Sequence, residues 1–227
     1  MRIIKKRTLH QETANMLRDM IMTGELKEGE KINENKLCSS MGISKTPLRE
    51  ALRVLSAEGH VKLVPNRGSY VTRHTFIEIR EMFDVMSVLE GACARAAAEK
   101  MSENDFSSLE KIHEKLEQEY TRRDQKNYIH YNNLYHILLE ELAGNQTLSQ
   151  IINGLRQKIL LYRYESLDLP ERFDQSIEEH RRLLEAFQER DPEKAENFMR
   201  SHLRNQGDAL EKLRKGMSGK KETGAIT

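Results

Sequence analysis

Four polar residues in the C-terminal part of the sequence have types and spacing that suit a metal ion. Asn132 and His136 stand four residues apart, so a helix would carry both on one face. His180 and His202 lie on two later segments, each beside apolar residues that would be buried. Helical bundles build metal sites from imidazole rings that project inward from separate helices. The spacing alone also fits a second interpretation, in which each histidine forms ordinary hydrogen bonds at the edge of a core.

A second group of residues could contact a polyanion. Lys45, Arg49 and Arg53 recur every four residues and would form one basic face of a helix over residues 44–53. The apolar residues of this region fall at positions i, i+3, i+4 and i+7, on a different face: Leu48, Ala51, Leu52 and Leu55. An amphipathic surface helix with a solvated basic face shows the same pattern. The flanking segments must therefore decide between the two interpretations.

The segments before this helix indicate a helix-turn-helix. Residues 11–23 have the apolar spacing of a first helix, and residues 33–40 that of a short second helix. Gly42 would end the second helix in a left-handed conformation. A helix, a turn and two further helices with an exposed polar face form the arrangement in which the last helix reads DNA. The basic helix would occupy that reading position.

The segment after the basic helix predicts a β-hairpin. Residues 60–64 and 69–72 are short runs of β-prone residues, and residues 65–68 between them have the composition of a tight turn. Arg67 at the tip could approach phosphates or a minor groove, and Gly68 permits a positive φ and a close backbone approach. A hairpin that only caps a small core is the other interpretation. Its place after a helix-turn-helix favours a wing.

The composition indicates a helix-rich protein without a membrane span. The chain has 227 residues, 37% hydrophobic and 32% charged, which leaves room for one large or two modest domains. Its apolar runs are too short to cross a membrane, and residues 1–7 lack the apolar core of a secretory signal, so we expect a cytoplasmic protein. Cys38 and Cys93 lie in different predicted domains, which favours reduced thiols over a disulfide.

The net charge of +1 conceals an uneven distribution of charge. Residues 1–73 contain 14 Lys and Arg against 8 Asp and Glu, a net charge of +6. The remaining residues contain 23 and 28, a net charge of −5. The N-terminal part therefore suits a polyanion, and the acidic remainder would avoid it.

The rest of the chain predicts an all-α bundle. From about Phe76 onward six or seven helices follow one another with short connections, the last ending near Arg214. Residues 216–227 are polar and Gly-rich, and we expect them to be disordered. The expected fold is thus mostly α, with a winged helix-turn-helix over 1–73, an all-α domain over 74–215, and a short tail.

The N-terminal motifs carry a family resemblance. The run INENKLCSSMGISKTPLREALRVLSAEGHVKLVPNRGSYV resembles the winged helix-turn-helix of GntR-type bacterial transcription regulators. The resemblance implies that Lys45, Thr46 and Arg49 contact operator DNA, together with Asn35 and Gly68. With the basic face and the wing, the expected DNA-binding residues are Asn35, Ser44, Lys45, Thr46, Arg49, Arg53, Arg67 and Gly68. At Lys45 the family usually has Arg, so this position lacks the planar guanidinium that bonds guanine at two points.

The C-terminal motifs resemble a second domain. The runs NNLYHILLEELAGN, IEEHRRLLEAFQERDPEKAE and MRSHLRNQ are similar to the FCD ligand-binding domain of the FadR-type branch of this family. The resemblance implies that Asn132, His136, His180 and His202 hold a divalent metal such as Zn, Ni or Mn. Asn132 replaces the usual Asp, which removes a negative charge; an amide oxygen can still coordinate, with lower affinity.

The effector site departs from the family pattern as well. The family usually has an Arg where this chain has Met86, and that Arg faces the ligand cavity. Its loss removes a guanidinium that could bind a carboxylate at two points. Similar regulators respond to small organic acids. Either Arg156 or Arg163 supplies the positive charge together with the metal, or the effector of this protein is less acidic.

These features predict a regulator and leave two alternatives. We expect a homodimeric, effector-responsive DNA-binding protein, a repressor in the first instance, on half-sites of double-stranded operator DNA. A metal-dependent bundle enzyme would need two E-x-x-H motifs, and the sequence offers Glu110–His113 without a second one or a paired nucleophile. A constitutive DNA-binding protein would bind neither effector nor metal.

Overall fold

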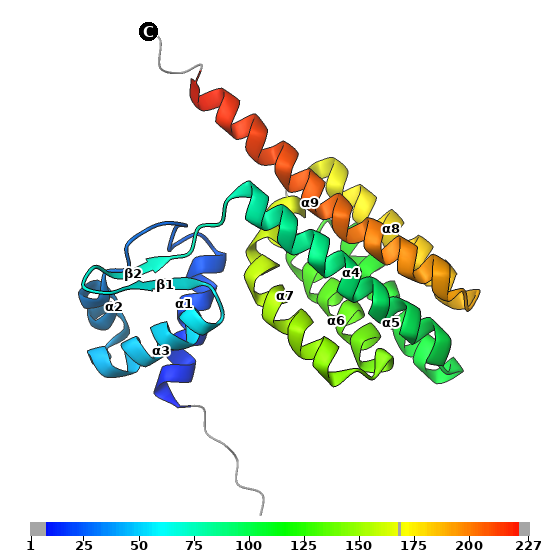
Figure 1. Ribbon diagram of the computed structural model, residues 1–227, viewed down its shortest axis with the longest axis horizontal. Helices are drawn as coiled ribbons and strands as arrows, with labels where there is room; N and C mark the ends of the chain where they lie inside the picture. Colours follow the sequence, from blue (N-terminus) through cyan, green and yellow to red (C-terminus); the bar gives the residue numbers. More distant parts are fainter. Residues whose placement is uncertain (1–7, 168, 223–227) are drawn as a thin grey trace, which may run out of the picture. The chain divides into compact units, whose positions relative to one another are not determined.

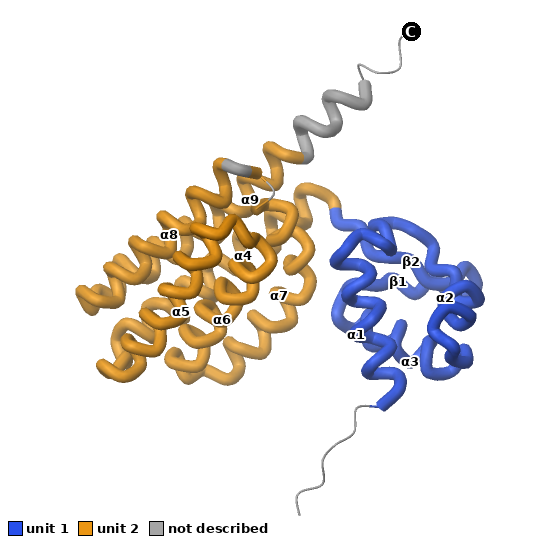
Figure 2. The backbone as a smooth tube through the Cα atoms, turned by 180° about the vertical axis from the view of Figure 1, so that it is seen from behind, with its two compact units in different colours: residues 1–74 blue, residues 75–227 orange. Residues whose placement is uncertain are grey.

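The chain folds into two compact units that meet in sequence at the His74–Thr75 bond. The computed structural model describes residues 8–167 and 169–222, and the units are Met1–His74 and Thr75–Thr227 (Figure 2). In this described part of the chain, no helix combines the length and the apolarity that a bilayer crossing requires. The predicted fold class, mostly α with one small hairpin, is confirmed.

The first unit contains three helices and a two-stranded antiparallel hairpin (Figure 1). Its elements are α1 (Leu9–Met22), α2 (Glu34–Met41), α3 (Lys45–Ala57), β1 (Val61–Val64) and β2 (Gly68–Val71). The apolar face of α3 packs into a core with α1 and with the two hairpin valines Val61 and Val71. Because Leu48, Leu52 and Leu55 are buried there, the basic residues of α3 are left on the opposite, exposed face.

Two glycines shape the turns on either side of α3. Gly42 ends α2 with φ of 64°, the left-handed conformation in which a residue with a Cβ is strained. Gly68 begins β2 with φ of 101°, opposite Val64 in the hairpin register. The tight turn between the strands also contains Asn66 with φ of 58°, which asparagine tolerates better than most residues. These turns fix where α3 and the hairpin tip lie within the unit.

The second unit is a helical bundle. Its described helices are α4 (Phe76–Lys100), α5 (Glu103–Thr121), α6 (Gln125–Ala143), α7 (Gln146–Leu167), α8 (Pro170–Gln188) and α9 (Pro192–Glu222). Helix α4 packs against α6, α7 and α9, and α5 packs against α6 and α8. Local signals set the starts: Thr75 and Ser102 form capping boxes, and Asp191 caps α9, which has Pro192 at its first position.

The predicted end of the last helix differs from the structure. We expected this helix, α9, to end near Arg214, but its backbone remains helical to Glu222. The expectation that residues 216–227 are disordered stays a prediction, and residues 223–227 lie outside the described part.

Glycines let α4 and α9 approach closely. A Cβ on Gly91 would lie 2.5 Å from Cγ of Arg200, and one on Gly207 would lie 3.1 Å from Cβ of Phe83. This contact brings the C-terminal helix of the bundle against its first helix. Helix α9 therefore covers one side of the bundle interior, where its polar residues His202 and Gln206 are buried.

Candidate metal centre and DNA-binding surface

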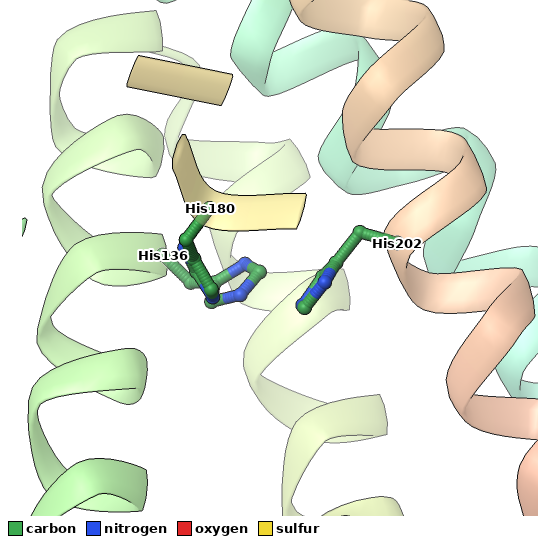
Figure 3. A group of neighbouring side chains, drawn as sticks. All are labelled: His136, His180 and His202. Carbon is green, nitrogen blue, oxygen red and sulfur yellow. The ribbon is translucent and has the colours of Figure 1, made fainter. Parts of the chain in front are cut away.

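Three histidines from three different helices meet inside the bundle. His136 comes from α6, His180 from α8 and His202 from α9, and their rings point toward one another (Figure 3). Each offers a ring nitrogen, and these nitrogens all lie within 4.8 Å of one another. The side chains of His180 and His202 have no exposed surface, and that of His136 is 1% exposed.

Two of the rings are held by buried carboxylates. Nδ1 of His136 bonds Oε2 of Glu90 on α4, and Nδ1 of His202 lies 2.7 Å from Oε2 of Glu179 on α8. A neutral imidazole beside a carboxylate donates its N–H to it, which leaves the other nitrogen with a lone pair. Carboxylates that orient metal-binding histidines in this way fix the ring and raise its basicity. Both rings therefore keep Nε2 as a buried acceptor.

The third ring bonds Asn132. Nε2 of His180 lies 2.6 Å from the side-chain oxygen of Asn132, which is 3% exposed and stands one turn before His136 on α6. The rings of His180 and Tyr135 also pack in a T-shaped arrangement, with their centroids 4.9 Å apart. The structure thus brings together all four residues for which the sequence predicted metal binding.

The cluster leaves one nitrogen of each histidine without a partner. Nε2 of His136, Nδ1 of His180 and Nε2 of His202 are buried, and none has a hydrogen-bond partner among the described residues. Buried polar atoms are seldom left unpaired in folded proteins. Three buried imidazoles that each bring a ring nitrogen within 4.8 Å of the others, with an amide oxygen beside His180, fit a metal ion that prefers nitrogen ligands. This buried cluster could hold a metal.

Burial keeps the three rings neutral. It lowers the pKa of His136 to about 4, and it lowers the pKa values of His180 and His202 as well. The neighbouring histidines contribute to the lowering for His180, because three imidazolium ions could not share this space. A neutral ring is the form that binds a metal, so the site needs no deprotonation at neutral pH.

Glu90 is the centre of a buried ion-pair network. Its Oε1 lies 3.2 Å from Nη2 of Arg156 and 3.2 Å from Nη2 of Arg163, both on α7. Arg156 also pairs with Glu140 of α6. Burial alone would raise the pKa of Glu90, but the facing His136, Arg163 and Arg156 hold it well below its ordinary value. Glu90 is therefore an anion inside the bundle.

The three predicted effector residues are buried inside the bundle. Met86 is fully buried in the apolar core of the bundle. Arg156 and Arg163 already neutralise Glu90. The Nε atoms of Arg156 and Arg163 are buried without a hydrogen-bond partner among the described residues.

Sequence reasoning missed the residues that support the histidines. The sequence patterns did not single out Glu90, Glu179 or Arg172, although Glu179 stands beside His180 in the run IEEHRRLLEAFQERDPEKAE. A usable signal was present: Arg172 and Glu179 are seven residues apart on the same face of α8 as the buried Phe173 and Ser176. Charged residues on an apolar stripe indicate a buried ion pair.

The basic residues of the first unit form an exposed surface. All eight predicted DNA-binding residues are exposed, and five of them line one shallow groove of about 520 Å³: Asn35, Lys45, Arg49, Arg67 and Gly68. Arg49 also lines a neighbouring groove with Arg53 and the hairpin turn. Ser44 and Thr46 stand at the start of α3, outside both grooves. The recognition helix and the wing thus present one continuous surface.

An ion pair steadies one of these arginines. Nε of Arg49 lies 2.9 Å from Oε2 of Glu34, at the start of α2. The Arg49 side chain is 61% exposed, so the pair contributes little to stability. It leaves both terminal nitrogens of Arg49 available to a phosphate or a base edge.

The E-x-x-H pair does not join the histidine cluster. His113 is buried on α5 with its Nε2 3.9 Å from Glu117, and Glu110 is exposed. Among the described residues, the group of side chains that could hold a metal consists of His136, His180 and His202.

Family models match both units. The model described as bacterial regulatory proteins, gntR family, matches residues 9–71, and the FCD domain model matches residues 81–205. This chain belongs to the GntR family and carries an FCD domain. The GntR match implies that the winged unit binds DNA, and the FCD match implies a small-molecule effector. FCD domains commonly bind metal, which agrees with the buried histidines.

Curated relatives are transcription regulators. The chain is 25% identical to the HTH-type transcriptional repressor RspR of Escherichia coli, over 91% of this chain and 90% of the relative. It is 26% identical to the Glc operon transcriptional activator of the same species, over 88% of both. It is 27% identical to the HTH-type regulator YdhC of Bacillus subtilis, over 86% and 88%. The protein is a DNA-binding transcription regulator and not an enzyme.

Solved structures support the fold. The structure of Escherichia coli McbR/YncC aligns with a TM-score of 0.76 at 22% identity, covering 92% of this chain and all of that one. At this identity the match establishes the common architecture of winged unit and bundle.

Proposed function

We propose that this GntR regulator is a homodimeric repressor whose operator affinity is controlled by a small organic acid bound beside a divalent metal in the bundle. The observation that carries the proposal is the set of three orphaned imidazole nitrogens from His136, His180 and His202. A regulator with a wholly apolar bundle interior would give a small anion no place to bind.

The donor set favours a nitrogen-preferring metal. Three neutral imidazoles and the amide oxygen of Asn132 suit Zn or Ni better than Mg or Ca, which prefer several carboxylates, and Mn stands between them. Asn132 supplies no charge, so a bound divalent ion would keep its full positive charge toward a ligand. That charge would attract the carboxylate of an organic acid. Glu90 and Glu179 would hold two of the ligand rings in place.

The exposed surface of the winged unit would read the operator. Lys45, Thr46 and Arg49 would contact base edges or phosphates from α3, with Arg53 on the same face and Arg67 at the wing. Ser44, Asn35 and Gly68 would supply phosphate contacts from the surrounding turns. Two copies of the chain related by a two-fold axis would occupy the half-sites of a pseudo-palindrome. The unit Met1–His74 would thus read DNA, and the unit from Thr75 would sense the effector and dimerise.

Operator binding tests the proposal directly. Fluorescence anisotropy would follow binding to DNA from the region upstream of the protein's own gene, with zinc-loaded and chelator-treated protein, at several salt concentrations. We expect specific binding that weakens with salt and is released by one or more of a series of small organic acids, only in the zinc-loaded protein. Equal release from the chelated protein would contradict the metal-linked effector site. Absence of any sequence preference would contradict the operator-binding role.

A further inference from the structure

A buried arginine next to the histidine cluster lacks partners for most of its donors. Arg172, in the first turn of α8, is 1% exposed. Its Nη2 lies 2.6 Å from Oε2 of Glu179 and 3.4 Å from the backbone oxygen of His202. Its Nε and Nη1 are buried and have no partner among the described residues. The guanidinium therefore meets only part of its hydrogen-bonding capacity inside the protein.

The carboxylate that pairs with Arg172 is shared with other donors. Oε2 of Glu179 also accepts a hydrogen bond from Nδ1 of His202, and Oε1 accepts one from the side chain of Asn205 at 2.7 Å. A buried cation with unpaired donors is unfavourable, and one carboxylate divided among three donors compensates for it poorly. A second anion at Arg172 would complete the pairing.

A cavity gives such an anion access. A cavity of about 1130 Å³ opens between α8 and α9, and Arg172, Glu179 and Asn205 are among its lining residues. The three histidines do not line it, nor do Arg156 and Arg163. Its volume is slightly above the range usual for small-molecule sites, so a small ligand would fill part of it. The cavity is thus separate from the histidine cluster and joined to it through Glu179.

The charges of the cavity limit what can bind there. Exposed carboxylates line it alongside basic residues; Glu171 lies next to Arg172, and Asp208 lies on α9. A ligand with several negative charges would be repelled by these groups. A ligand with a single carboxylate would meet Arg172 with that group and leave the uncharged remainder against the rest of the lining.

We propose that Arg172 anchors the carboxylate of a small monocarboxylic acid in the cavity between α8 and α9, and that Glu179 couples this site to His202. The anchor stands independently of the proposed metal, whereas the coupling rests on it. A ligand carboxylate that takes over the pairing of Arg172 leaves more of the Glu179 charge to His202. A carboxylate that bonds Nδ1 more strongly makes the ring a better metal ligand. The acid therefore strengthens metal binding, and the metal strengthens binding of the acid.

The anchor is tested without metal or DNA. Chelator-treated full-length protein would be titrated with butyrate and, as the uncharged match, butyramide, with binding followed by calorimetry and by the melting temperature. We expect saturable binding of butyrate and none of butyramide. Arg172→Gln should abolish the binding, and Ala209→Phe should also abolish it, because Ala209 lines the cavity and a larger side chain would fill it. Arg204→Gln changes an exposed arginine of α9 outside the cavity and should bind butyrate as the wild type does.

Several results would overturn the anchor. These are no butyrate binding to the wild type, equal binding of butyramide, or unchanged butyrate binding in Ala209→Phe and in Arg172→Gln. Circular dichroism would confirm that each variant is folded. If Arg172→Gln does not fold, Ala209→Phe decides. Because neither metal nor operator is present, a negative result leaves the proposed operator control untouched.

The coupling is tested by zinc titration with and without butyrate. We expect zinc to bind the wild type about 5-fold more tightly when butyrate is present, within the usual range of coupled sites. Glu179→Gln should remove that difference while zinc still binds through the three histidines. An unchanged zinc affinity in the wild type would overturn the coupling alone. No zinc binding at all would overturn both the coupling and the proposed metal site, and the anchor would still be judged by the butyrate titration.

Discussion

The two units of this regulator place their charged residues in opposite ways. In the first unit the core is built from apolar residues, and the basic residues of α3 and the wing stand on the surface. In the second unit charged and polar residues lie inside the bundle, among them Glu90, Arg163 and His180. The exposed basic residues of the first unit suit a large partner that docks from outside. The buried charged residues of the second unit suit small partners that the bundle encloses.

The same contrast appears in the ion pairs. Arg18 and Glu58 of the first unit are 2.8 Å apart, with side chains 22% and 26% exposed. Arg163 and Glu90 of the second unit are 3.2 Å apart, with side chains 1% and 2% exposed. Water screens the first pair and cannot reach the second. Changes of the same chemical kind should therefore have very different effects in the two units.

The largest expected effect is on stability. Glu90→Gln leaves Arg156 and Arg163 without their shared anion, and we expect it to lower the free energy of unfolding by about 3–5 kcal/mol. Glu58→Gln, the matched change at a partly exposed pair, should cost about 1 kcal/mol or less. Urea unfolding followed by circular dichroism measures both. An equal loss of unfolding free energy in the two variants would show that the buried and the exposed pair contribute alike to stability.

Metal binding should depend on the interior alone. His180→Ala removes one of three ring ligands, and we expect metal affinity to fall by at least about 100-fold, since even loss of a supporting residue costs about 10- to 100-fold. His130→Gln changes an exposed histidine of α6 and should leave metal content as in the wild type. Metal analysis after dialysis against a zinc buffer reports the result. Full metal content in His180→Ala would rule out the proposed ligand set.

DNA binding should depend on the surface alone. Arg49→Ala should weaken operator binding by about 10- to 100-fold, corresponding to about 1–3 kcal/mol for a base or phosphate contact from the recognition helix. Arg80→Ala removes an exposed arginine of α4 that pairs with Glu211, and it should leave operator affinity unchanged. Anisotropy with labelled operator compares the two. A loss of similar size in both variants would point to a general effect of charge.

The smallest expected effect is on the acid response of the first unit. Burial lowers the pKa of His60 below 6.5. Just below pH 6.5 the unfolded chain therefore binds a proton there that the folded chain does not. The free energy of unfolding should fall as the pH drops below about 6.5. His60→Gln should remove this contribution, as seen by hydrogen exchange of α1 and α3 amides at pH 7.5 and 5.5. If the free energy of unfolding of His60→Gln showed the same pH dependence as that of the wild type, His60 would not be its source.

The contrast also explains what the sequence could reveal. Lys45, Arg49 and Arg53 are on one helix, and their separation from the apolar face follows from helical period alone. The wing and the capping residues are equally local. The interior network depends on which helices touch: Glu90 meets His136 only because α4 packs on α6, and Glu179 meets His202 only because α8 packs on α9. Spacing along one helix cannot supply those contacts.

The predicted end of the last helix, near Arg214, lies too early for a related reason. The polar, Gly-containing run after Arg214 has weak helix propensity, and the structure continues α9 through it to Glu222. Propensity summed over a short window is a weak guide where a long helix is already formed, because extending it requires no new nucleation.

The histidine cluster has a consequence for how the bundle unfolds. Its members come from helices α6, α8 and α9, so a metal held by them would act as a reversible cross-link among segments that are distant in sequence. Such a link favours the folded state in proportion to the logarithm of free metal concentration, by about 2.7 kcal/mol at 100 times the dissociation constant. The bundle would then melt at a temperature that reports the metal supply, while the winged unit would melt independently of it.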